Sequence, residues 1–352
     1  MSLPVQALAA GALGPALLHI ERGDTDLAQR VIAEATADGV SVGANASLFH
    51  GAPALEFVLG AAKCMDAKLQ AAVDAVVSRR LVAAYDRQAV GRRPTLGEFD
   101  LVGGLTGLGV VLLSRGRPTS LLDEVLTYLV GLATPACLDG TTLPGWWTDT
   151  GPSGEALDGG HSNHGMAHGI AGPLALLATA MRQGVEVGGQ AEAIQTLTEW
   201  LERFGSAYWI IRDQLVGHEL LPAGTSRPSW CYGAAGIARA LQLAAIALGD
   251  RGRRQQAEHL AHAALSAPSV SRTIVDASLC HGWAGLLQVT KAVAEDSAEP
   301  ALFRGLVQEL ARRTRLGLDA LPDTGLMEGK AGAELSLLDS SVTGWARLML
   351  LS

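Results

Sequence analysis

Long apolar runs, basic clusters and abundant cysteines are all missing from this 352-residue sequence. None of its apolar stretches approaches the ~20 residues that a membrane-spanning helix needs. The opening residues, MSLPVQALAAGALG, lack the charged segment that begins a signal peptide. A net charge of −8 without a Lys/Arg stripe argues against a nucleic-acid partner. We therefore expect a cytoplasmic protein with no membrane span and no nucleic-acid ligand.

Aromatic residues and cysteines are scarce. Aromatics make up 5% of the chain, whereas Ala, Leu and Gly are abundant, a composition that favours close packing of helices. The four cysteines, Cys64, Cys137, Cys231 and Cys280, are too few and too scattered for a disulfide scaffold in a chain of this length. A metal site or a reactive thiol is therefore the expected use of any special cysteine.

A short glycine motif occurs seven times, and apolar residues at helical spacing, or apolar nearly all round, follow each copy. The first glycines of the copies are Gly11, Gly51, Gly104, Gly169, Gly233, Gly282 and Gly329. Amphipathic stretches such as residues 193–209 lie between the copies, so the predicted unit is a buried helix paired with an outer one. Seven such hairpins form either an open solenoid or a closed ring, and periodicity alone does not decide between them.

The two positions before each first glycine occupy the same place on every hairpin. In a closed ring they would all point toward one spot. Five copies carry metal-ligand or titratable residues there, and the other two carry Ala9, Ala10, Val102 and Gly103. The five copies supply His50, His168, Cys231, Tyr232, Cys280, His281 and Glu328.

Cys231, Cys280 and His281 form a candidate zinc triad, because two thiolates and one imidazole leave the fourth tetrahedral position open, as catalytic zinc sites do. Adjacent residues on a helix point about 100° apart, so Cys280 and His281 can share an ion only where the backbone is not helical, just before Gly282. Cys64 and Cys137 lie outside the motifs, and we expect them to be small buried hydrophobes.

The stretch GGHSNHGMAHGIAG offers a rival site of three histidines, His161, His164 and His168. Gly165 and Gly169 disfavour a continuous helix through them. Only His168 has the motif register, and it is therefore the candidate general acid/base. His161 and His164 are expected to be solvated or to pack within a loop. The role of His50 stays open between hydrogen bonding to a neighbouring hairpin and a place in the site, and Glu328 stays open as well.

Two further residues could reach the rim of such a site. Asp100 could orient a histidine and Arg227 could donate to an oxyanion, although an N-cap or a surface ion pair is the usual reading of their spacing. Because Arg227 precedes Pro228, the segment RPSW is predicted to run extended rather than helical. No glycine motif here has the context of a nucleotide-binding loop.

The motifs WCYGAAG (230–236), CHGWAG (280–285), MAHGIAG (166–172), EFDLVGGLTG (98–107) and GLMEGKAGAEL (325–335) resemble the lanthionine synthetase C family of lanthipeptide cyclases. The resemblance spans nearly the whole chain, 1–352, as one domain. It implies an α/α toroid of seven helical hairpins around one zinc. The implied ligands are Cys231, Cys280 and His281, and the implied active-site residues are His168, Asp100, Arg227 and Tyr232. The short stretch before Gly11 leaves open whether the first hairpin is complete or whether the ring closes with the C-terminal TGWARLMLLS.

The reaction implied is Michael addition of a peptide cysteine to dehydroalanine or dehydrobutyrine, which gives a thioether ring in a dehydrated precursor peptide. Two alternatives come from other classes of protein. A zinc hydrolase would use the same site to activate water, and a non-catalytic helical-repeat scaffold would only bind peptides. The sequence leaves open which precursor is cyclised and whether the dehydratase that makes this substrate is a partner in a complex.

Overall fold

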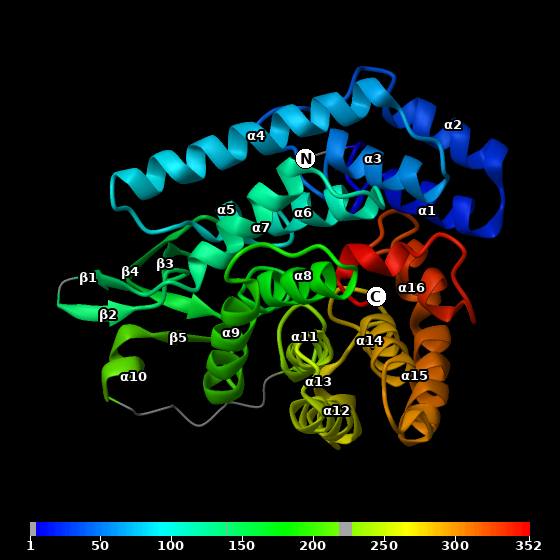
Figure 1. Cartoon of the computed structure of the whole chain (residues 1–352). Helices are drawn as coiled ribbons and strands as arrows, with labels where there is room; N and C mark the ends of the chain where they lie inside the picture. Colours follow the sequence, from blue (N-terminus) through cyan, green and yellow to red (C-terminus); the bar gives the residue numbers. More distant parts are fainter. Residues whose placement is uncertain (1–4, 139, 218–226) are drawn as a thin grey trace.

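In this computed structural model, which describes residues 5–138, 140–217 and 227–352, the chain forms an inner and an outer set of helices (Figure 1). Each glycine motif leads into an inner helix that is buried on most of its surface. The inner helices are α1 (Leu13–Arg22), α3 (Ala52–Ala61), α6 (Leu105–Ser114), α8 (Ala171–Arg182), α11 (Ala234–Ala247), α14 (Trp283–Glu295) and α16 (Lys330–Leu337).

The inner helices close into a ring, since each contacts the next in chain order and α16 contacts α1. Six of them are followed by an outer helix that packs against them. Outer α9, for example, buries Ile194, Leu197 and Leu201 on one face, as an amphipathic helix should. The outer helices are α2 (Thr25–Ala35), α4 (Ala67–Ala89), α7 (Ser120–Leu132), α9 (Gln190–Phe204), α12 (Arg251–Ser266) and α15 (Arg304–Gly317). This arrangement is the predicted α/α toroid, although among the described residues six of the expected seven hairpins have an outer helix.

The first hairpin is complete, because each outer helix follows its inner helix rather than preceding it. The seventh inner helix, α16, is followed by a C-terminal segment that contains η3 (Trp345–Met349). Glu21 of α1 accepts a hydrogen bond of 2.6 Å from the backbone N–H of Val342. Trp230 donates its indole N–H to the Met349 carbonyl at 3.0 Å. The C-terminal segment is thus fastened to both α1 and the loop before α11.

Two small antiparallel sheets, which the repeat pattern does not predict, lie at one side of the ring (Figure 1). The predicted amphipathic stretch 193–209 is helical only as far as Phe204, and Trp209 already begins a strand. The strands are β1 (Ala136–Leu138) with β2 (Thr141–Leu143), and β3 (Thr148–Thr150), β4 (Ala156–Asn163) and β5 (Trp209–Ile211) in the order β3-β4-β5. The short helices are α5 (Leu96–Phe99), α10 (Arg212–Gly217), α13 (Val270–Thr273), η1 (Pro300–Phe303) and η2 (Leu318–Ala320).

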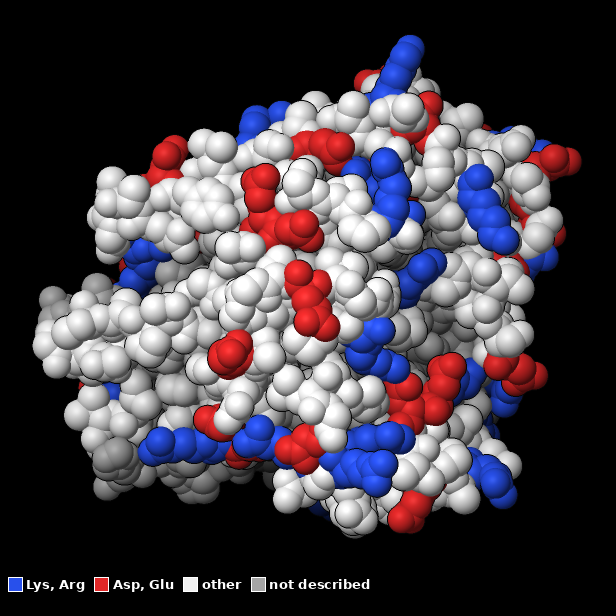
Figure 2. All heavy atoms as spheres, viewed as in Figure 1, with Lys and Arg blue, Asp and Glu red and all other residues white. Residues whose placement is uncertain are grey.

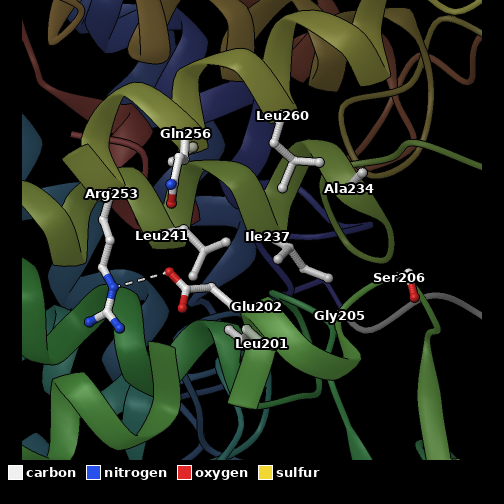
Figure 3. A pocket seen from close by; sticks show the side chains of 11 residues that line it. Leu201, Glu202, Gly205, Ser206, Ala234, Ile237, Leu241, Arg253, Gln256 and Leu260 are labelled. Carbon is white, nitrogen blue, oxygen red and sulfur yellow. Dashed lines mark ion pairs between the residues drawn. The ribbon is translucent and has the colours of Figure 1, made fainter. Parts of the chain in front are cut away.

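Basic and acidic side chains are interspersed on the face of the molecule shown in Figure 2. A groove of about 640 Å³ lies between α9, α11 and α12 (Figure 3), with Ile237 and Leu241 in its lining. At one end of this groove Arg253 Nε pairs with Glu202 Oε1 at 3.2 Å. Within the described part of the chain, no helix combines the length and the apolar character needed to cross a bilayer.

Candidate active site and metal centre

Backbone hydrogen bonds tie the glycine loops to one another around the mouth of the ring. The Ala167 N–H donates to the Cys231 carbonyl at 3.3 Å, and the Cys231 N–H to the Cys280 carbonyl at 3.4 Å. The Cys280 N–H donates to Met327 at 2.8 Å, and the Met327 N–H to Ala9 at 2.9 Å. The backbone of each cysteine is therefore held by hydrogen bonds to two neighbouring loops, independently of its side chain.

The second glycine of the motif is explained by close packing rather than by a ligand. In five copies a Cβ at that position would overlap the carbonyl oxygen of the residue six positions earlier, so only glycine lets the first turn of the helix lie on its own loop. The five pairs are Gly107 on Leu101, Gly172 on Met166, Gly236 on Trp230, Gly285 on Leu279 and Gly332 on Leu326. The second copy has Ala54 at this position.

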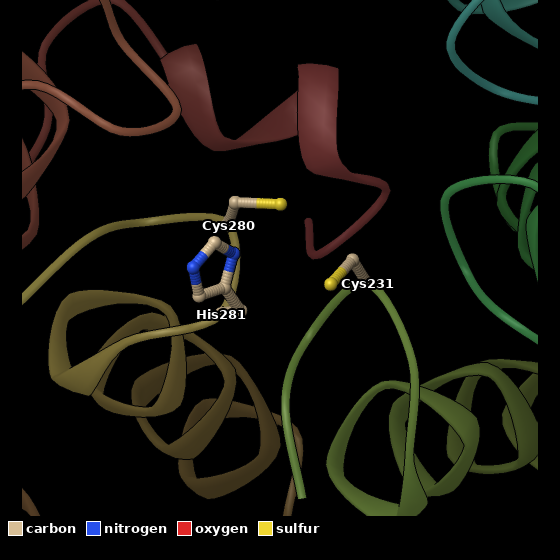
Figure 4. A group of neighbouring side chains, drawn as sticks. All are labelled: Cys231, Cys280 and His281. Atoms are coloured by element: carbon tan, nitrogen blue, oxygen red, sulfur yellow. The ribbon is translucent and has the colours of Figure 1, made fainter. Parts of the chain in front are cut away.

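Cys231, Cys280 and His281 come together at this mouth, and their ligand atoms all lie within 4.8 Å of one another (Figure 4). Cys231 is buried, whereas Cys280 and His281 are partly exposed. Gly282, in an extended conformation, caps α14 and ends the non-helical segment that carries the last two. Loops from two neighbouring hairpins therefore supply a compact set of two sulfurs and one nitrogen.

The two thiols interact directly. A hydrogen bond from Cys280, helped by the Ser229 hydroxyl and the charges of His281 and Arg227, lowers the pKa of Cys231 to about 6. The same hydrogen bond, with burial, raises the pKa of Cys280. The pKa values of the two thiols are thus shifted in opposite directions, which favours the thiolate form of Cys231. Two sulfurs and one imidazole nitrogen within 4.8 Å of one another are a donor set that suits a divalent cation such as zinc.

Asp276 holds the third member of the cluster. Its Oδ2 lies 3.3 Å from His281 Nε2, and its Oδ1 accepts the backbone N–H of Ser278 at 2.7 Å. Figure 4 shows the imidazole turned with its other nitrogen toward the two sulfurs. A carboxylate on one nitrogen fixes the tautomer and leaves the opposite lone pair for a metal.

His168 and Asp100 form a second unit beside the thiols. Asp100 is buried, and its Oδ1 accepts the backbone N–H groups of Gly103 and Gly104 at 2.6 and 2.9 Å. Its Oδ2 lies 2.6 Å from His168 Nδ1. The carboxylate therefore accepts from Nδ1–H, and His168 Nε2 is the nitrogen that remains for chemistry.

Tyr232 connects the two units. Its ring stacks on that of His168 with a centroid distance of 6.3 Å and an interplanar angle of 29°. Burial raises the pKa of Tyr232 to about 12, so the phenol keeps its proton near neutral pH. Asn163, at the end of β4, donates its side-chain N–H to the Tyr232 oxygen at 3.0 Å.

Arg227 lies four residues before Cys231 in the segment that leads into α11, and its charge contributes to lowering the pKa of that thiol. The prediction of an extended RPSW segment is wrong in part. The segment is not helical, but the Ser229 N–H donates to the Arg227 carbonyl at 2.9 Å, which closes a three-residue turn centred on Pro228. The Tyr208 hydroxyl donates to the same carbonyl at 3.2 Å.

The remaining candidates fall in different places. His161 and His164 are buried in and beside β4 rather than solvated, and burial lowers the pKa of His164 to about 4. The charge of exposed Glu328 helps to raise the pKa of Cys280, so it lies near the cluster. Burial lowers the pKa of His50, and among the described residues its Nδ1 has no hydrogen-bond partner.

Cys64 and Cys137 are both exposed, so the expectation that they are buried is wrong. Cys64 follows the end of α3 and Cys137 lies in β1, so neither belongs to a glycine loop that leads into an inner helix. The sequence interpretation also missed Asp276 and Asn163. Each lies six residues before the first glycine of its motif, and this shared register is the signal that could have found them.

A closed ring of paired helices with a Cys₂His cluster at its mouth defines an α/α toroid with a candidate metal site. A profile of the family described as lanthionine synthetase C-like protein matches residues 6–348. The chain therefore belongs to the lanthionine synthetase C-like family, as its motifs indicated.

Two known proteins illustrate this similarity. The nisin biosynthesis protein NisC of Lactococcus lactis subsp. lactis is 27% identical over 206 residues, which are 54% of this chain and 48% of NisC, so the match spans about half of that protein. The solved structure of nisin cyclase superposes with a TM-score of 0.79 at 20% identity and covers 100% of this chain and 93% of that chain. The second comparison confirms the predicted toroidal fold.

Proposed function

We propose that this protein is a zinc-dependent lanthipeptide cyclase and that residues 1–352 are one cyclase domain acting in the cytoplasm. It would add cysteine thiols of a dehydrated precursor peptide to dehydroalanine or dehydrobutyrine and form (methyl)lanthionine rings. The observation that carries the proposal is the proximity of a Cys₂His donor set to the pair of buried Asp100 and partly exposed His168, with Tyr232 between them.

Cys231, Cys280 and His281 would hold the zinc. Two neighbouring sulfurs and an imidazole fixed by Asp276 fit this ion, and three protein ligands are the number found at catalytic rather than structural zinc. When bound, zinc would supply a Lewis acid that lowers the pKa of a substrate thiol.

The protein's own residues would manage the charge and the proton. As sulfur bonds to the β-carbon, the electron pair of the alkene moves toward the adjacent carbonyl and an enolate develops. The Tyr232 hydroxyl and the Arg227 guanidinium would donate to its oxygen. His168 Nε2 would deliver a proton to the α-carbon. The thiol proton leaves to solvent, from which His168 regains its own, so the reaction is an isomerisation of the peptide.

The substrate must come from an enzyme that dehydrates serine and threonine in the precursor, and we propose that dehydratase as a second partner. The test is mass spectrometry of a dehydrated precursor after thiol alkylation, with and without the protein. Because cyclisation leaves the mass unchanged, the expected result is loss of alkylatable thiols at constant peptide mass. Thiols that stay alkylatable while the peptide binds would identify a scaffold instead. Turnover of esters or amides without a dehydrated peptide would identify a hydrolase.

A further inference from the structure

Asn163 contacts Tyr232 from outside the glycine loops. It is the last residue of β4 and is 2% exposed. Its Oδ1 accepts the backbone N–H of Gly165 at 3.1 Å, and its Nδ2 lies 3.0 Å from the Tyr232 hydroxyl oxygen. A backbone N–H can only donate, so the amide cannot be flipped, and Nδ2 must be the donor to the phenol.

This fixed direction decides what the Tyr232 hydroxyl can do. Its oxygen accepts from Asn163, and its own hydrogen is not used by any hydrogen bond within the described part of the chain. The ring is also held in place, since Tyr208 packs on it with a centroid distance of 5.5 Å. A Cβ at Gly165 would lie 2.8 Å from two of its ring carbons, so this glycine leaves the space that the ring fills.

We propose that Asn163 is a positioning residue for cyclisation, which donates to the Tyr232 oxygen and thereby leaves the hydroxyl hydrogen available to the enolate oxygen. This inference rests on the proposed cyclase function and deepens it by assigning the source of the donor's orientation. An acceptor in place of the amide would take the phenol hydrogen and reverse the bond.

The decisive variant is Asn163→Asp, compared with Tyr232→Phe and with both changes together. A carboxylate keeps the shape of the amide and still accepts from Gly165, but it also accepts the hydrogen of Tyr232. We expect kcat of Asn163→Asp to fall as far as that of Tyr232→Phe, by about 100-fold, the typical effect of losing one oxyanion donor. KM, the melting temperature and the metal content should stay near those of the unmodified protein.

The double variant shows whether the residue acts through Tyr232. If it does, Asn163→Asp/Tyr232→Phe is no slower than Tyr232→Phe alone, because one interaction cannot be lost twice. A double variant slowed by the product of the two single effects, or Asn163→Asp at the normal rate, would overturn the inference. Full activity of Tyr232→Phe would overturn both the inference and the role assigned to Tyr232.

Ultraviolet resonance Raman difference spectra, normal protein minus Tyr232→Phe, provide a readout that does not depend on cyclisation. The tyrosine ring doublet reports whether the phenol accepts or donates a hydrogen bond. We expect an acceptor in the normal protein and a donor in Asn163→Asp. If the normal protein formed no thioether at all, the cyclase proposal would fail, whereas an unchanged doublet in Asn163→Asp would reject the assigned direction of the bond.

Discussion

Two pairs of glycine loops form similar backbone hydrogen bonds but carry different side chains. One pair lies before α11 and α14, and the other lies before α1 and α3. The first two present Cys231, Cys280 and His281, whereas the loops before α1 and α3 present Ala9 and Phe49 at the corresponding position two residues before the first glycine. All four take part in the hydrogen bonds that tie neighbouring loops together. The ring is therefore held together by glycines and main-chain hydrogen bonds. The side chains just before each first glycine are not needed for this, so reactive ones can occur in some loops and not in others.

The largest effect expected from breaking this contrast is loss of the metal. Cys231→Ala, Cys280→Ala and His281→Ala should each purify without stoichiometric zinc and cyclise no faster than the spontaneous reaction, because each removes one of the three proposed ligands. Elemental analysis and the alkylation assay measure both results. Cys64→Ala and Cys137→Ala, exposed cysteines away from the mouth, are the matched controls. A full zinc content in Cys280→Ala would reject the triad.

The next largest effect concerns the proton donor. His168→Asn should keep the metal and the fold but slow cyclisation by about 10²- to 10⁴-fold, the usual contribution of a general acid. The rate of alkylation-resistant product measures it, together with the configuration of the new α-carbon. His50→Asn, the histidine in the loop before α3, is the control and should cyclise normally. Equal rates for His168→Asn and the unmodified protein would remove His168 from the mechanism.

Substitutions of Arg227 test whether its guanidinium donates to the enolate or only forms a structural ion pair. If the guanidinium stabilises the enolate, Arg227→Ala should slow cyclisation by about 100-fold relative to the unmodified protein. Arg227→Lys should slow it almost as much, because a lysine point charge does not reproduce the planar fork of the guanidinium. Cyclisation rates and melting temperatures of both variants measure this. A surface ion pair would instead cost under about 1 kcal/mol in stability and leave both variants active.

Asp276 should affect metal affinity more than stability. Asp276→Ala frees His281 Nε2 and should weaken zinc binding by about 10- to 100-fold, as loss of a carboxylate behind a histidine ligand does. Competition with a chromogenic chelator measures the change. Asp323→Ala, which removes an exposed aspartate paired with Lys330 just before α16, is the matched control. Equal zinc affinities in the two variants would show that Asp276 does not orient the ligand.

The smallest effects are expected at the second glycine of the motif, where substitutions should change the stability of the ring and not the chemistry at its mouth. Gly285→Ala forces a Cβ against the Leu279 carbonyl and should destabilise the fold by about 1–3 kcal/mol. Ala54→Gly restores the missing glycine in the second copy and should cost only about 1 kcal/mol, mainly through chain entropy. Urea denaturation measures both. A Gly285→Ala protein as stable as the original would contradict the packing explanation of the motif.

Much of the fold was predictable because its signals are local. The seven motifs predicted the inner helices, and five of their first glycines are N-caps in the structure: Gly51, Gly104, Gly233, Gly282 and Gly329. The two small sheets were not predictable from this repeat, since they lie where successive glycine motifs are separated by the most residues. The buried state predicted for Cys64 and Cys137 was wrong, because a residue type gives only an average burial.

The sequence by itself determined that buried helices begin at glycine motifs and that two of these motifs carry cysteine. Only the tertiary structure decided that the helices close into a ring and that particular side chains meet within it. Asn163 and Tyr232 are 69 residues apart, and His168 and Asp100 are 68 apart. Helical periodicity reports which face of a segment is apolar, but it carries no information on which distant segment lies opposite. That choice is made by packing and by backbone hydrogen bonds between loops.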